Sequence, residues 1–233
     1  MLNFAKKIKP DSVMRRFFSA IAATLLAAIF ILPVVSHAAT SEEFFKLIQL
    51  DDYRRLPKLF AAGLDPNVVE SKRGDTGLIL AVREDSMKSF DVLLNTPGID
   101  LNARAHNGDT ALMVAAYKNN VAAVKALLGK EVDPNNKGWA ALHYAAAVGN
   151  NEIVQLLLDA SAYIDADSPN HTTPLMMAAR AGQILTVKLL LDSGADATLK
   201  NDVGMTAIDF AKKFEHQDIV DGLTHRLKQA GKL

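Results

Sequence analysis

Histidines and closely spaced aspartates are the residues of this chain whose types and spacing come nearest to acid–base or metal chemistry. Asp165 and Asp167 share one turn, but no third ligand follows at the spacing that a Ca²⁺ loop requires. The six histidines lie apart, without the i, i+4 pairing that builds a zinc site on a helix. Asp51 and Asp52 precede a predicted helix, where acidic side chains stabilise the N-terminus. The chain contains no cysteine, so thiol chemistry is excluded.

Other catalytic patterns are missing as well. The sequence lacks a nucleophile beside a base, a glycine-rich phosphate loop and paired carboxylates suited to a pocket. The formal net charge is +0, and no clustered positive charge indicates a nucleic-acid surface. We therefore predict a protein that is not an enzyme, with no catalytic residue, no cofactor and no metal, and with neither nucleic acid nor a small-molecule substrate as a partner. An enzyme with a site assembled from distant parts of the chain is the alternative.

A repeated block organises the chain from Thr40 onward. It reads GDTGLILAV from Gly74, GDTALMVAA from Gly108, GWAALHYAA from Gly138, HTTPLMMAA from His171 and GMTAIDFAK from Gly204, at nearly constant spacing. A second apolar segment follows, such as VKALLG or VKLLLD. Apolar positions three and four apart predict two amphipathic helices per repeat. One such pair cannot bury its own apolar stripe, so the pairs must stack.

This pattern resembles the ankyrin repeat, which has a period of about 33 residues and the signature T-P-L-H-x-A. The segment TTPLMMAA at residues 172–179 matches that signature closely. The resemblance covers essentially all of residues 41–233. It implies an all-α fold, an ankyrin-repeat solenoid of about six helix-turn-helix units linked by β-hairpin-like fingers. The expected units are 41–72, 73–104, 105–135, 136–167, 168–200 and 201–233, of which the first and last read as polar caps.

The chain departs from the family pattern at two places. In the family, the Thr and His of the signature hydrogen-bond to neighbouring groups and fix the start of the first helix. Here they never occur together, and His143 follows Ala140 instead of a threonine. We predict that His143 is a hydrogen-bonded structural group rather than a catalytic or metal-binding one. Second, only three steps separate Asn135 from Gly138, against six in neighbouring repeats, which predicts a shorter finger just before Trp139.

The segment 1–38 carries a different signal from the repeats. A basic stretch precedes the uncharged apolar residues 17–35, and the small residues Ser36 and Ala38 follow. This order predicts a secretory signal peptide over residues 1–38 that is cleaved after Ala38. An uncleaved anchor is the alternative, with contact to a membrane only through residues 17–35. In both cases residues 39–233 are expected on the far side of the membrane, which we interpret as the bacterial periplasm or the outside of the cell.

The resemblance also implies where a partner binds. In the family, partners occupy the concave groove formed by the fingers and the inner faces of the first helices. The corresponding positions flank the turn glycine of each repeat and follow its alanine pair. These predicted protein-binding residues are Arg73, Asp75, Arg83, His106, Asp109, Tyr117, Lys118, Lys137, Trp139, Val148, Asn170, Thr172, Arg180 and Met205. We expect Tyr117 and Trp139 to be near neighbours at an aromatic centre of this groove.

Trp139 is the only tryptophan of the chain and lies beside a turn glycine. Tryptophan, tyrosine and arginine are enriched at binding hot spots, so we predict a largely exposed contact residue. The alternative is that the indole folds back and fills the space left by the short finger. The sequence thus favours a non-catalytic protein–protein interaction module that binds an envelope or secreted protein. Two alternatives are an immunity or inhibitor protein against a periplasm-acting toxin or hydrolase, and a structural spacer without a preferred partner.

Overall fold

The computed structural model describes residues 37–232, so almost all of the predicted signal peptide lies outside the described residues. The chain divides into two compact units, Met1–Ala39 and Thr40–Leu233, and the second unit carries the repeats. The first helices of its pairs are α2 (His37–Gln49), α4 (Gly77–Arg83), α6 (Ala111–Tyr117), α8 (Ala141–Val148), α10 (Pro174–Arg180) and α12 (Ala207–Lys213). The second helices are α3 (Leu56–Ala61, after the 3₁₀ turn η1, Tyr53–Arg55), α5 (Met87–Leu94), α7 (Val121–Leu128), α9 (Asn151–Asp159), α11 (Ile184–Asp192) and α13 (Gln217–Gln229). Among the described residues, no helix has both the length and the apolar character needed to cross a membrane.

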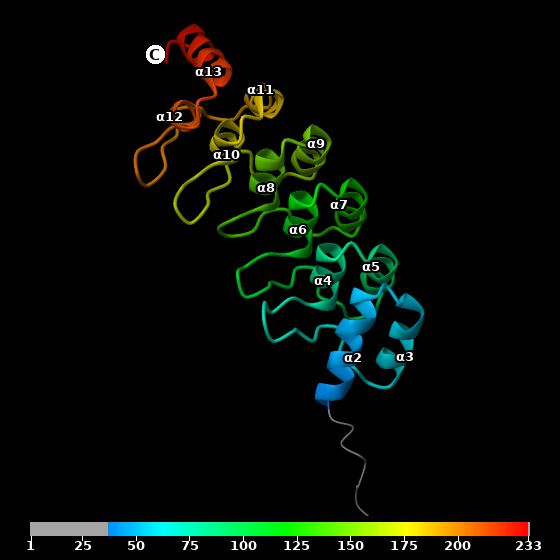
Figure 1. Ribbon diagram of the computed structural model, residues 1–233. Helices are drawn as coiled ribbons and strands as arrows, with labels where there is room; N and C mark the ends of the chain where they lie inside the picture. Colours follow the sequence, from blue (N-terminus) through cyan, green and yellow to red (C-terminus); the bar gives the residue numbers. More distant parts are fainter. Residues whose placement is uncertain (1–36, 233) are drawn as a thin grey trace, which may run out of the picture. The chain divides into compact units, whose positions relative to one another are not determined.

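The helices of this unit form two layers (Figure 1). Helices α4, α6, α8, α10 and α12 pack against one another in chain order, and α7, α9, α11 and α13 do the same in the second layer. From α4 onward, each second helix also packs on the first helix of its own pair. The predicted all-α stack of helix-turn-helix units is therefore confirmed.

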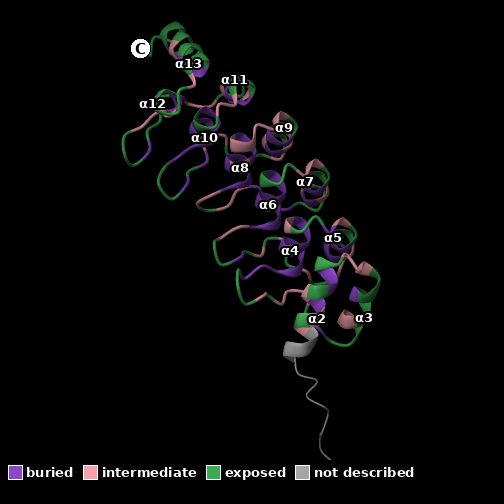
Figure 2. Cartoon of the chain, viewed as in Figure 1, coloured by how far each residue is buried: buried purple, intermediate pink, exposed green. Residues whose placement is uncertain are grey.

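Alanine at one repeated position allows the first helices to approach closely. Ala81, Ala115, Ala145, Ala178 and Ala211 hold the same place in successive repeats, and each is 0% exposed. Leucine supplies the bulk from the second helices, at Leu93, Leu127, Leu157, Leu190 and Leu223, again at 0% exposure. The buried side chains run continuously between the layers (Figure 2). Each unit therefore completes its core with its neighbours, as expected for a repeat stack.

The starts of the first helices are fixed by side-chain caps. The hydroxyl oxygens of Thr76, Thr110, Thr173 and Thr206 accept hydrogen bonds from the backbone N–H three residues later, at 3.3–3.4 Å. At α8, where Ala140 replaces the threonine, Nδ1 of buried His143 accepts from the Ala140 N–H at 3.1 Å. The other ring nitrogen, Nε2, lies 2.9 Å from the Thr172 carbonyl oxygen and donates to it. These bonds explain why His143 is a structural group that ties its unit to the next one.

The fingers precede the first helices and project from the α4–α12 layer (Figure 1). They are hairpin-like rather than true strands. In residues 37–232 the only β-type pairing is an isolated antiparallel bridge between Val69 and Thr76. Elsewhere a finger is closed by individual backbone bonds, such as the 2.9 Å bond from the Ala105 N–H to the Asp109 carbonyl.

Candidate protein-binding face

The fingers and the last turns of α4, α6, α8, α10 and α12 lie on one side of the repeat stack, which is here called the finger face. All fourteen residues predicted to bind a partner belong to these segments. Arg73, His106, Tyr117, Lys118, Lys137, Asn170 and Arg180 are exposed. Arg83, Asp109, Trp139, Val148 and Met205 are half-buried, and Asp75 and Thr172 are buried. The repeat pattern thus places most of the predicted residues at the surface of the finger face.

The two buried residues serve the fold, which corrects the prediction that they contact a partner. The Asp75 carboxylate, at 0% exposure, lies 2.9 Å from Nε of Arg73 and 2.9 Å from Nε of Arg83. It thereby joins the finger of the second unit, 73–104, to the end of α4. Each finger is numbered here by its unit. The Thr172 N–H donates to Oγ of Ser168 at 2.8 Å, and its carbonyl accepts the His143 bond. Neither side chain can reach a partner unless the finger opens.

Tyr144 connects the two aromatic residues that the sequence singled out. Its ring is 6.1 Å from that of Tyr117 at 81°, and 6.4 Å from that of Trp139 at 50°. Trp139 also meets His143 edge-on, with ring centroids 5.2 Å apart. Tyr117 and Trp139 therefore belong to one cluster, here called the aromatic cluster, but Tyr144 lies between them. The prediction that they are near neighbours needs this correction.

Exposure differs strongly within the aromatic cluster. Tyr117 is 62% exposed, whereas Trp139 is half-buried against His143 and Tyr144. The prediction of a largely exposed indole is therefore wrong, because the ring of Trp139 packs against His143 and Tyr144 of α8. An exposed tyrosine on a rigid, partly buried aromatic base is a typical anchor for a protein partner.

Sequence reasoning missed Tyr144 altogether. It occupies the place held by Val114 and Met177 in neighbouring repeats, which reads as a core position. Its hydroxyl donates to Oδ1 of Asp109 at 2.9 Å, in the preceding finger. Burial, followed by this bond to the carboxylate, raises the pKa of the Tyr144 hydroxyl well above its ordinary value. Tyr144 is thus a neutral hydrogen-bond donor that fixes the cluster between two units.

The cationic side chains near the start of the finger face are neutralised by carboxylates. Besides its bonds to Asp75, Arg83 approaches Asp109 at 3.6 Å, and Arg73 approaches Glu84 at 3.6 Å. These contacts continue through Asp109 to Tyr144. The network fixes the second, third and fourth units relative to one another and leaves little free positive charge there.

Positive charge is less compensated further along the face. In the described part of the chain, Lys118 and Lys137 make no ion pair, and Arg180 makes none either. The Arg180 guanidinium instead lies over the ring of Phe214, 5.2 Å from its centroid. Phe214 is 40% exposed, so this cation–π pair is a second partly exposed aromatic group of the finger face.

Two histidines of the fourth and fifth units have pKa values that burial or hydrogen bonding shifts. Burial lowers the pKa of His143, although its hydrogen bonds to Thr172 and Ala140 oppose the shift. His171 is hydrogen-bonded to Asp202, and its Nε2 is 3.4 Å from Asp167. Its pKa is raised, chiefly by the bond to Asp202. Within residues 37–232, no three acidic or histidine side chains gather in a way that could hold a metal ion.

The family comparison agrees with the architecture and with the repeat positions. The family described as "Ankyrin repeats (3 copies)" matches residues 45–137, 78–168 and 161–230. Together the three overlapping matches reach from the first helix pair to the last. The chain belongs to the ankyrin-repeat family.

Individual relatives share the repeats with this chain. It is 33% identical to human SH3 and multiple ankyrin repeat domains protein 2 over 158 residues, which are 66% of this chain and 8% of that protein. It is 35% identical to zebrafish (Danio rerio) neurogenic locus notch homolog protein 1 over 123 residues, 52% of this chain and 5% of the relative. It is 32% identical to bovine (Bos taurus) mitochondrial disaggregase over 147 residues, 60% of this chain and 22% of the relative. Because the chain spans less than a quarter of each, none of their activities is carried over to it.

Proposed function

We propose that this protein is a non-catalytic binding module whose finger face holds another protein. Ankyrin repeats generally mediate protein–protein interaction, and the fold here is an ankyrin stack. The observation that carries the proposal is Tyr117, which is 62% exposed while its ring rests edge-on against the half-buried Tyr144. Such a side chain offers a large contact area at little cost in conformational entropy.

The partner we propose is an envelope or secreted protein. The support is in the sequence, where the basic start, the apolar residues 17–35 and the small residues Ser36 and Ala38 form the pattern of an export signal. N-terminal sequencing of the protein from a periplasmic fraction should give a chain that starts at Ala39. A full-length chain held in the membrane would support the anchor instead, and recovery from the cytosol would refute export.

The binding proposal is tested by crosslinking the protein to its partner and measuring how much partner is captured. Two variants, each changed at one exposed position, are compared. Tyr117→Ala should reduce capture of the partner at least about tenfold, since truncating a central aromatic anchor costs about 2 kcal/mol or more. Leu185→Ala is the matched control, because Leu185 is 67% exposed but lies on α11 in the other layer. Equal capture by both variants would contradict the proposal. The identity of the partner separates an adaptor from an inhibitor, since a captured hydrolase or toxin indicates inhibition.

A further inference from the structure

Within the described residues, the fourth finger, residues 135–139, lacks the backbone hydrogen bond that joins other neighbouring fingers. Between the second and third fingers, the His106 N–H donates to the Arg73 carbonyl at 2.8 Å. Between the fifth and sixth, the Asp202 N–H donates to the Asn170 carbonyl at 3.1 Å. In the described part of the chain, no backbone bond of this kind joins the fourth finger to either neighbour. Of the neighbouring fingers as the structure describes them, only the side chain of Arg104 in the third finger bonds to it, at Asn136 and at the Lys137 carbonyl.

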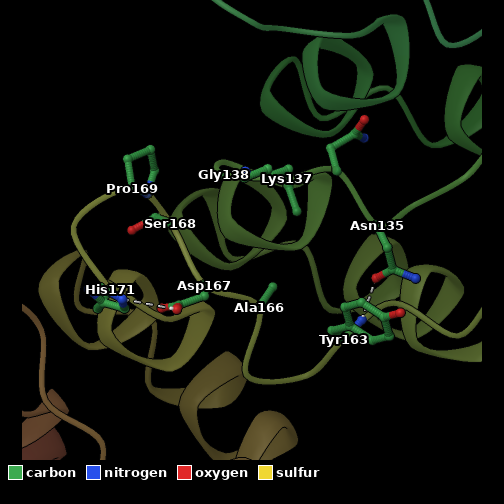
Figure 3. Close-up of a pocket in the computed structure, with 11 residues that line it drawn as sticks. Asn135, Lys137, Gly138, Tyr163, Ala166, Asp167, Ser168, Pro169 and His171 are labelled. Carbon is green, nitrogen blue, oxygen red and sulfur yellow. Dashed lines mark hydrogen bonds and ion pairs between the residues drawn. The ribbon is translucent and has the colours of Figure 1, made fainter.

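The shortened finger leaves a pocket on its side toward the fifth unit (Figure 3). The volume is about 690 Å³, and the lining includes Lys137, Gly138, Tyr163, Asp167 and His171. Lys137 and Gly138 come from the fourth finger, whereas Asp167 and His171 come from the fifth. The volume falls within the range of pockets that bind ligands, and it exceeds what one small side chain would fill. We call this feature the fourth-finger notch.

The fourth-finger side of the notch is rich in hydrogen-bond donors without acceptors. Among the described residues, the backbone N–H groups of Asn136, Lys137 and Gly138 have no acceptor within the chain. Nδ2 of Asn136 is buried without a partner, and the Lys137 ammonium makes no ion pair. The acceptors nearby are already used, since Arg104 donates to Oδ1 of Asn136 at 2.7 Å and to the Lys137 carbonyl at 3.4 Å. Such a segment favours an anionic oxygen.

The opposite side of the notch does not cancel this preference. Asp167 is the one carboxylate of the lining, and its Oδ2 is 3.4 Å from Nε2 of His171. The bond to Asp202 and the charge of Asp167 raise the pKa of His171, which favours the charged imidazolium. Asp167 therefore shares the charge of His171 with Asp202, whereas Lys137 has no ion-pair partner among the described residues.

We infer that the fourth-finger notch binds an aspartate or glutamate carboxylate on an acidic segment of the partner protein. A carboxylate supplies two acceptor oxygens for the unpaired backbone donors and a charge for Lys137. Trp139 follows directly after Gly138 of the lining, so its emission can report binding beside it. This inference rests on the proposed function, because it names the chemistry of the partner that the finger face holds.

The test uses the purified full chain and the emission of Trp139, the single tryptophan. The probe is the peptide Ac-Glu-Leu-Glu-Glu-Leu-Glu-NH₂, with Ac-Gln-Leu-Gln-Gln-Leu-Gln-NH₂ as its uncharged counterpart. The acidic peptide should change the emission with saturation, and the glutamine peptide should bind at least about tenfold more weakly, because charge-assisted hydrogen bonds are about twice as strong as neutral ones. Equal binding of both peptides, or no saturable change, would overturn the inference.

Two variants locate the binding. Lys137→Glu should lower the affinity for the acidic peptide at least about tenfold. Lys228→Glu makes the same charge change at an exposed position of α13 and should change the affinity by no more than about twofold. The second variant replaces Asn136 and Lys137 by the Ala-Arg-Ala-His-Asn of the third finger, which restores the usual finger length and should abolish the saturable change. Circular dichroism confirms that each variant is folded. Peptide binding unchanged by both variants would place it elsewhere and overturn the inference.

Failure of this inference can be told apart from failure of the proposed function. Partner capture that is lost in Tyr117→Ala but retained in Lys137→Glu and in the lengthened finger supports the finger face and refutes the notch. Partner capture lost in all three variants supports both. If all three variants still capture the partner, both the proposed finger-face binding and the notch inference are refuted.

Discussion

Gly77 lies so close to the ring of Phe44 that a side chain at this position would force a neighbour to shift. A Cβ atom on Gly77 would be 2.8 Å from Cε1 of Phe44 and 3.0 Å from Cδ1 of Ile48, and closer still to Cζ of the ring. Gly77 begins α4, where the following repeats have Ala111, Ala141, Pro174 and Ala207. Glycine stands here because the ring of Phe44 of α2, buried at 0% exposure, occupies the space that a Cβ atom would need.

Gly77→Ala should therefore destabilise the protein by about 1–3 kcal/mol, the usual cost of overpacking a core. Helix propensity alone favours alanine over glycine and therefore predicts a change of the opposite sign. Urea denaturation gives the difference. Phe44→Leu should make the same substitution tolerable, so the double mutant should be more stable than the sum of the two single effects predicts. A neutral Gly77→Ala would show that α2 yields to the added methyl group.

A residue one or two positions after each first helix adopts a left-handed backbone, and Glu215 is poorly suited to it. Its φ is 63°, whereas Gly149 and Gly182 hold the equivalent places at 86° and 73°. A non-glycine residue in this region costs about 1 kcal/mol. Glu215→Gly should raise the free energy of unfolding by about 0.5–1 kcal/mol, measured by thermal and urea denaturation. Glu215→Ala removes the same charge but keeps a Cβ atom, so a comparable gain from alanine would contradict the backbone explanation.

His143 should make the stability depend on pH. Burial is the largest influence on its pKa and lowers it from the ordinary 6.5, so the folded state favours the neutral ring. A group whose pKa is lower in the folded state binds more protons when unfolded, and its stabilising contribution is lost as the pH falls below about 6.5. The buried ring must then accept a charge while Nδ1 gives up its bond from the Ala140 N–H.

The control for this prediction comes from the neighbouring repeats, where Met113 and Met176 hold the position of His143. In melting curves between pH 7.5 and 5, His143→Met should lose the part of the acid destabilisation that the wild type shows near pH 6. His171 has a raised pKa, so its contribution has the opposite sign, present below about pH 6.5 and lost as the pH rises. The comparison is therefore repeated in a His171→Asn background. Parallel pH profiles for the wild type and His143→Met would refute the assignment.

The repeat period and its capping residues made the architecture predictable. The threonine caps and the alanine and leucine positions recur in register, because every unit solves the same packing problem with its neighbours. The features that differ from one unit to the next were harder to foresee. Tyr144 reads as a core residue, and only the fold brings its hydroxyl to Asp109 of the preceding finger.

Side-chain burial on the fingers was also beyond the sequence. Asp75 looks like any acidic turn residue until Arg73 and Arg83 converge on it. The short fourth finger could be counted from the spacing of Asn135 and Gly138, but the count does not show which neighbour fills the space. The structure answers in two parts, with Trp139 packed against α8 and a pocket open toward the fifth finger.

Tyr117 and Trp139 should separate binding from stability. Tyr117 is 62% exposed, so Tyr117→Ala should change the free energy of unfolding by no more than about 0.5 kcal/mol, as is usual for surface sites. Trp139→Ala should cost about 1–3 kcal/mol, because the indole loses its edge contact with His143 and its packing on Tyr144. Trp139→Phe keeps an aromatic ring and should recover part of that loss. Urea denaturation, followed by circular dichroism, measures the stability of all three variants, since two of them lack tryptophan.

In the wild type, the half-buried indole should emit at wavelengths between those of buried and solvated tryptophan, and acrylamide should quench it only partly. A fully solvated emission together with a neutral Trp139→Ala would mean that the indole leaves α8 in solution, and that Trp139 joins Tyr117 as an exposed contact residue.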